Sequence, residues 1–313
     1  MILEGIIATS RLDKHNMRFT KEALESGAKL INGDRCSAFT IEHDATVPPI
    51  GKVLKASVRE EDDGEYLLVA QQEVFERESN LVLPDGAMAI RRESETDIRP
   101  IVTNIEQPDK FQLIYDPTNF SSSEIAEEFF QSIRAKTGEN AFAERSRIRK
   151  SEIPDPEIVI TLSKALLTYL AGKKLIEKIG DKIADKVTDD IAKFYDLVKS
   201  TTINMLKYAI PKNRPITYVF DAPGSPQIQF VAVTNDSKLL ESAIKEEKLM
   251  EKLKYADELS STLGATKIQF LLNHGGDWEF NYLLTNTGGV IGTPKSFGKQ
   301  ARRIEILGNK QLN

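Results

Sequence analysis

The stretch "GKVLKASVREEDDGEYLLVAQQEVF", residues 51–75, decides how the N-terminal part of the chain folds. Two runs rich in apolar and β-branched residues flank an acidic segment that contains the dipeptide Asp63-Gly64. An Asp-Gly pair between two such runs is a strong signal for a tight hairpin turn. The stretch therefore predicts two antiparallel strands joined at Asp63-Gly64.

Similar short runs on both sides of this hairpin predict further strands. They are "LEGIIATS" (3–10), "CSAFTIEHD" (36–44), "GAMAIRR" (86–92) and "KFQLIYD" (110–116). One early helix, "TKEALESGAKLING" (20–33), is expected to end at the Asn32-Gly33 turn signal. Many short strands separated by turns are typical of a mostly antiparallel barrel or sandwich.

After about residue 120 the predicted elements are mainly helices, and the whole chain is expected to be an α+β protein. Ser121 and Glu124 have capping-box spacing before a helix, and "SEIPDPEI" (151–158) is a proline-containing linker candidate. Apolar residues at helical spacing then predict a long amphipathic helix, with Gly172 and Gly180 as weak points. The predicted segments are a mostly β domain at 1–120, a helix and linker at 121–158, the long helix at 159–210, and a small α+β domain at 211–313.

Composition restricts the classes of partner. The 313 residues carry a formal net charge of −5, with acids and bases interspersed, which argues against nucleic-acid binding. The single cysteine, Cys36, cannot form an internal disulfide. We find no signal-peptide pattern and no apolar run of membrane-spanning length, so we expect a soluble, cytoplasmic protein.

The amphipathic helix at 161–201 has three readings. It could belong to an intramolecular core, form the seam of an oligomer, or lie at a membrane interface. Its polar face carries both signs of charge, which argues against the membrane reading. We expect it to bind a protein partner or a second copy of the chain, giving a homo-oligomer.

Familiar signatures of cofactor and metal chemistry are absent from the sequence. There is no phosphate-binding P-loop, no glycine-rich dinucleotide fingerprint and no Cys/His zinc pattern. We therefore expect neither a cofactor nor a metal ion. His274 lies in an expected hairpin turn, and Trp278 is most simply a core or edge aromatic. His43 is the remaining candidate for chemistry.

The N-terminal third of the chain resembles the prohead maturation proteases of tailed phages, which are related in fold to the herpesvirus assemblins. The resemblance covers about residues 3–120 and rests on the order and spacing of several short motifs. These are "RFTKEALESGAKLING" (18–33), His43-Asp44 and Pro49-Ile50-Gly51 within "IEHDATVPPIGKV" (41–53), Asp63-Gly64 within "REEDDGEYLLVAQQEV" (59–74), and, loosely, "DPTN" (116–119).

The resemblance implies a β-barrel of prohead-protease type, with His43 at the position of the general base. It places the nucleophilic serine on the strand "GAMAIRR", where this chain has Ala89. An alanine has no hydroxyl to activate, so acyl transfer by the family's route is not expected. Ser79 and Ser94 lie outside the expected strand context. The acid that would orient the histidine stays open among Glu106, Asp109 and Asp116.

Several functional hypotheses remain open. Ala89 could mark a natural pseudoprotease or an engineered serine-to-alanine change, and His43 could simply be a turn residue. The first hypothesis is an inactive serine-protease-like domain fused to an assembly or interaction region. The second is a non-catalytic recognition and oligomerisation protein of phage morphogenesis or bacterial anti-phage defence. The third is a membrane-active effector that uses the 161–201 helix.

Overall fold

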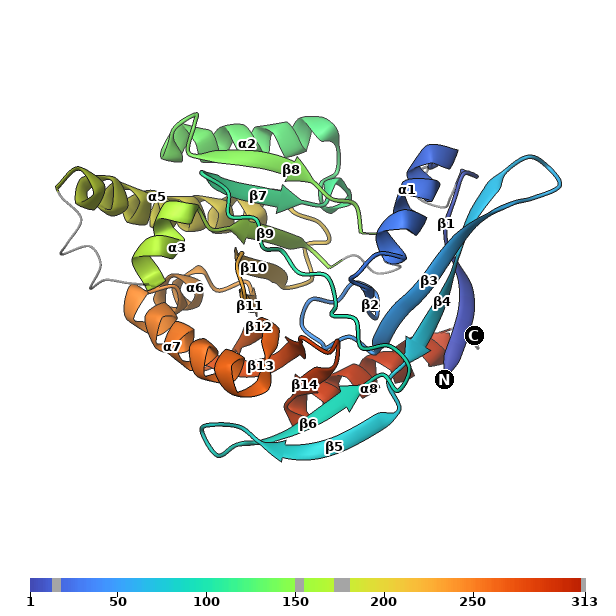
Figure 1. Ribbon diagram of the computed structural model, residues 1–313. Coiled ribbons are helices and arrows are strands. Elements are labelled where there is room, and N and C mark those ends of the chain that lie inside the picture. The colour runs from blue at the N-terminus through green and yellow to red at the C-terminus, as the bar shows by residue number, and fades with distance from the viewer. Residues whose placement is uncertain (13–17, 150–154, 172–180, 311–313) are drawn as a thin grey trace. The chain divides into compact units, whose positions relative to one another are not determined.

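The computed structural model describes residues 1–12, 18–149, 155–171 and 181–310 and shows two compact units (Figure 1). Unit 1 comprises Met1–Thr103, Leu259–Lys267 and Asn281–Asn313. Unit 2 comprises Asn104–Glu258 and Ile268–Phe280. The C-terminal third therefore contributes to both units, and the division into four consecutive segments stays a prediction.

The described elements confirm a mixed α+β protein. The strands are β1 (Ile2–Thr9), β2 (Ser37–Phe39), β3 (Gly51–Glu60), β4 (Tyr66–Val74), β5 (Arg77–Val82), β6 (Met88–Glu93), β7 (Phe111–Tyr115), β8 (Phe142–Ser146), β9 (Glu157–Thr161), β10 (Ile216–Ala222), β11 (Gln227–Thr234), β12 (Ala265–Leu272), β13 (Trp278–Thr285) and β14 (Val290–Gly292). The helices are α1 (Lys21–Ile31), α2 (Ser123–Thr137), α3 (Lys164–Ala171), α5 (Asp181–Tyr208), α6 (Ser237–Ala243), α7 (Glu246–Leu263) and α8 (Pro294–Lys310), with a short 3-10 helix η1 (Pro117–Asn119).

The predicted hairpin lies at the centre of an antiparallel four-stranded sheet in unit 1, with strand order β1-β4-β3-β2. Gly64 has a φ of +77°, which the turn requires and which glycine adopts without steric cost. The amide of Glu61 donates to the carbonyl of Glu65 at 2.8 Å and closes the loop. Helix α1 covers one face of this sheet and buries Leu24 and Ala28 against it.

Helix α1 ends where the sequence predicts, and its last residues are held by side chains from elsewhere in unit 1. Asn32 donates from Nδ2 to the carbonyl of Ala56 at 2.8 Å and accepts from the amide of Ala56 at 2.9 Å. Arg99 donates from Nη1 to the carbonyls of Gly33 at 2.9 Å and Ile31 at 3.3 Å. Carbonyl groups at a helix C-terminus lack intrahelical donors, and the guanidinium supplies them.

The N-terminal strands do not close into the barrel that we expected; the described strands form two open sheets. Strands β5 and β6 leave the four-stranded sheet, and β6 pairs with β14 from the far end of the sequence, Arg91 opposite Ile291. These strands belong to a ten-stranded sheet of order β5-β6-β14-β13-β12-β11-β10-β9-β7-β8. Strand β6 is therefore paired on one side with β5 and on the other side with β14, so it has no free edge for a further N-terminal strand.

In unit 2, the predicted long helix begins later than expected. Residues Glu157–Thr161 form β9, which pairs in parallel with β10, and the described helices start at Lys164 and Asp181. The segment "EIVIT" is rich in β-branched residues, which favour a strand. The weak points predicted at Gly172 and Gly180 lie outside the described residues.

The apolar face of α5 is used inside unit 2. Phe194 packs on Phe111 of β7 and Phe220 of β10, with ring centroids 5.9 and 6.1 Å apart, and Leu197 and Val198 are fully buried. Helix α2 lies beside α5 (Figure 1). Where the burial of α5 is described, its apolar residues therefore belong to the core of unit 2. A role of this helix in an oligomer interface stays a prediction.

Across the described helices, we find none long and apolar enough to cross a membrane.

Candidate functional site

His43 lies in a strained turn between β2 and β3. Glu42 and His43 have φ angles of +51° and +53°, in the left-handed region that non-glycine residues rarely adopt. The amide of Asp44 donates to the carbonyl of Ile41 at 2.9 Å. Asp44 Oδ1 accepts from the amide of Thr46 at 2.8 Å and from its hydroxyl at 2.6 Å. These bonds compensate for the backbone strain.

The C-terminal part of unit 1 holds the same turn. Gln300 of α8 donates from Nε2 to the carbonyl of Pro48 at 2.7 Å, and Lys299 donates to the hydroxyl of Thr46 at 2.6 Å. Asn281 of β13 donates to the carbonyl of Thr46 at 3.0 Å. Because these donors lie more than 200 positions away in the sequence, no local pattern could predict them.

The carboxylate of Asp44 therefore has a structural role in this turn. One oxygen caps Thr46, and the other lies 3.7 Å from Nε of Arg303 on α8. The side chain of His43 is exposed at the tip of the turn. This arrangement matches the reading in which His43 is a turn residue.

The strain at His43 gives a measurable prediction. We expect His43→Val to lower the free energy of unfolding by about 1–2 kcal/mol, because a β-branched residue is disfavoured at positive φ. We expect His43→Asn to change it by less than about 0.5 kcal/mol, because asparagine tolerates this region. Urea denaturation followed by circular dichroism distinguishes the two. Equal effects of both variants would show that the imidazole itself stabilises the turn.

Ala89 lies in the interior of β6, a strand that is paired on both sides. It is opposite Leu81 of β5, and its neighbour Ile90 is opposite Gly292 of β14. The residue is only 1% exposed. A hydroxyl at this position would be removed from solvent, whereas a nucleophile must be reached by its substrate.

The other residues singled out by the resemblance lie in different places. Ser94 is in the loop after β6, where its hydroxyl donates to the buried carboxylate of Glu73, and Ser79 is exposed on β5. Glu106 and Asp109 are exposed residues of unit 2. Asp116, also in unit 2, is buried and accepts from the amide of Arg149 at 2.9 Å.

His274 and Trp278 flank the turn between β12 and β13. His274 lies in this turn, as predicted, and its side chain is exposed. Trp278 is 2% exposed, donates from Nε1 to the carbonyl of Ala243 at 2.8 Å, and packs on Phe230. The tryptophan is therefore a core residue of unit 2.

A buried ammonium group follows the Pro49-Ile50-Gly51 motif. Lys52 is fully buried and donates to the carbonyls of Asp97 at 2.5 Å and Arg99 at 2.8 Å. Burial lowers the pKa of the Lys52 ammonium group, and burial also raises the pKa of the nearby Cys36 thiol. A thiol with a raised pKa is a poor nucleophile. Lys52 thus fastens the loop after β6 to β3.

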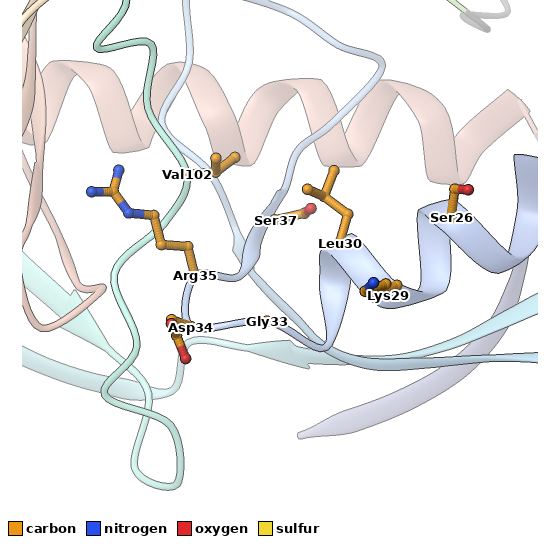
Figure 2. Close-up of a pocket in the computed structure, with 8 residues that line it drawn as sticks. All are labelled: Ser26, Lys29, Leu30, Gly33, Asp34, Arg35, Ser37 and Val102. Carbon is orange, nitrogen blue, oxygen red and sulfur yellow. The ribbon is translucent and has the colours of Figure 1, made fainter.

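An open cavity of about 550 Å³ lies at the C-terminal end of α1 (Figure 2). Leu30 and Val102 are 71% and 51% exposed there, and Lys29, Asp34 and Arg35 place both signs of charge around them. The lining side chains include the hydroxyls of Ser26 and Ser37 but no imidazole or thiol. Exposed apolar groups bordered by mixed charges suit binding better than catalysis.

Unit 2 contains a buried polar cluster that sequence reasoning missed. The carboxylate of Asp221 on β10 accepts from the side-chain amides of Gln227 at 2.5 Å, Gln229 at 3.0 Å and Asn104 at 3.0 Å. Asp221 lies opposite Thr161 in β9 and is 3% exposed. The available signal was a carboxylate inside the otherwise apolar run "ITYVFDA", because a charge in a buried strand needs partners.

The described residues contain no group of three or more His, Cys, Asp or Glu side chains that could hold a metal ion.

Comparison of the chain with protein families, with curated proteins and with solved structures found no significant match.

Proposed function

We propose that this chain acts by binding other molecules, and that it does not carry out acyl transfer through His43. One observation carries the proposal. The position expected to hold a serine nucleophile has a methyl group that is 1% exposed in the interior of β6, while His43 lies on an exposed turn. The exposed Leu30 and Val102 in the α1 cavity fit contact with a protein segment.

Within this proposal, the N-terminal region shares an ancestor with the prohead proteases. The hairpin at Asp63-Gly64 and the order of the His43-Asp44 and Pro49-Ile50-Gly51 motifs support it. The two open sheets in place of a barrel favour a role in recognition over a silenced protease. Recognition or assembly in phage morphogenesis or in anti-phage defence, with a protein partner or a second copy, is the corresponding biological role.

The rival reading, a protease silenced at position 89, is tested by Ala89→Ser. We expect this variant to fold, to keep its intact mass on prolonged incubation, and to form no adduct with a fluorophosphonate probe. A buried hydroxyl without a partner costs about 1–3 kcal/mol, so the measurement includes circular dichroism to confirm folding.

The matched control is the double variant Ala89→Ser/His43→Ala. If Ala89→Ser is labelled or cleaves itself and the double variant does not, residue 89 is a His43-dependent nucleophile. That result would contradict the binding proposal. A variant of the same kind at an exposed position, Ala143→Ser on β8, controls for non-specific labelling.

A further inference from the structure

Helices α2 and α5 form the walls of a cavity of about 530 Å³ on unit 2. Residues of α5 that recur every three or four positions face it, and Ser132 and Lys136 of α2 lie four positions apart on the other wall. Ser200 and Asn204 are 5% and 9% exposed and line its base. Cavities of roughly 300–1,000 Å³ are typical of small-molecule sites.

The charges around this cavity are mainly positive. Lys136, Lys199 and Lys207 line it, against the single acid Asp196. Over the described residues, neither Lys136 nor Lys199 forms an ion pair. Lys207 donates to the hydroxyl of Tyr208 at 2.7 Å, and this bond lowers the pKa of that hydroxyl. Among the described residues, these three lysines form no close ion pair, and Asp196 is the acid that lies one helical turn from Lys199.

A second cavity of about 600 Å³ on unit 2 shares Asp196 and Lys199 with the first. It adds Lys238 and Lys245, with Glu241 as a further acid. The two cavities together carry five lysines against two acids, although the whole chain has a net charge of −5. Positive charge is thus concentrated along the C-terminal half of α5 and at Lys238 and Lys245, and Lys199 lines both cavities.

We propose that the α2–α5 cavity binds a small, soluble, phosphate-bearing molecule with two or more negative charges, and that Lys199 is its central contact. Lysine ammonium groups act as point charges for phosphate, and hydroxyl groups such as those of Ser132 and Ser200 can donate to its oxygens. The size of the cavity favours a compact ligand over a polymer. The site is independent of His43 and Ala89, so the proposed function can stand or fall without it.

The test is isothermal titration of the full chain with two probes, pyrophosphate and ADP, at about 50 mM salt, where screening is weak. We expect saturable binding of both probes. Lys199→Glu should weaken it at least tenfold, because the substitution replaces attraction with repulsion at the shared wall. Asp196→Asn should strengthen it a few-fold, because it removes the one acid among the described residues that line the first cavity.

Lys254→Glu is the matched control, since Lys254 is an exposed lysine of α7 outside both cavities and the change in net charge is identical. We expect it to leave the affinity within about twofold of the natural chain. Failure of both probes to saturate, or equal loss in Lys199→Glu and Lys254→Glu, would overturn the proposal. Sedimentation with phosphoinositide-containing vesicles, without binding of either soluble probe, would overturn it in favour of a lipid surface.

Discussion

Replacing Gly51 with alanine is expected to destabilise unit 1 by about 3 kcal/mol or more, at the upper end of the cost of overpacking. A β-carbon at this position would lie 1.8 Å from the carbonyl oxygen of Glu73 and 3.0 Å from Cα of Val74. Both obstacles are backbone atoms of the paired strand β4, so no change of rotamer removes the clash. Strand β3 would have to separate from β4 where the hairpin begins.

Gly5→Ala is the control for Gly51→Ala, since Gly5 also lies in a strand of the same sheet but has no atom within 4 Å of an added β-carbon. We expect it to be neutral or to stabilise by about 0.5 kcal/mol, because alanine restricts the unfolded chain. Urea denaturation followed by far-UV circular dichroism measures both variants. Similar midpoints for the two would show that the close approach of β3 and β4 is absent in solution.

Replacing Asp221 with alanine is expected to destabilise unit 2 by about 2–4 kcal/mol. The side-chain amides of Gln227, Gln229 and Asn104 would lose their shared acceptor, and each buried donor left unpaired costs about 1–3 kcal/mol before any relaxation. The network cannot re-form around a methyl group. We expect Asp221→Asn to have an intermediate effect, because one acceptor oxygen remains.

The only tryptophan of the chain, Trp278, is buried in unit 2 and reports its unfolding by fluorescence. Asp257→Ala, at an exposed position of α7, should change the free energy of unfolding measured by fluorescence by less than about 0.5 kcal/mol. If Asp221→Ala were as mild as Asp257→Ala, the buried cluster would not hold the strands of unit 2 together.

Local sequence signals predicted the local structure well. The turn at Asp63-Gly64 and the end of α1 at Asn32-Gly33 depend on neighbouring residues, and both are confirmed. At α2, the N-cap is Ser122, which accepts from the amide of Ile125 at 3.3 Å, one residue later than the predicted Ser121. Three consecutive serines offer equivalent hydroxyls, so composition alone could not choose among them.

The arrangement of the strands could not be predicted in the same way. The pairing of β6 with β14 joins residues about 200 positions apart, and it replaces the barrel that the early strands suggest. Strand β9 crosses the boundary predicted between the linker at 121–158 and the long helix at 159–210, because a short apolar run fits both the strand period and the helix period until its parallel partner β10 is known. In both cases the structure is determined by a pairing strand that is distant in the sequence.

The candidate site shows the same limit. The sequence pointed to His43 and Ala89, but the contacts that hold the His43 turn come from Lys299, Gln300 and Asn281. The steric need for Gly51 likewise depends on Glu73 of the neighbouring strand, and its motif alone suggests only a turn. These structural roles depend on residues that are distant in the sequence, so they can be recognised only from the three-dimensional structure.

The most direct test of a non-catalytic role is the NMR signal of the His43 imidazole in the chain with Ala89 and in Ala89→Ser. With only three histidines in the sequence, single substitutions are sufficient to assign the signal. We expect the ring resonances of His43 to keep their positions when a hydroxyl is introduced at residue 89. Displaced resonances, with a new hydrogen bond between the ring and that hydroxyl, would show an assembled base and nucleophile and contradict the binding role.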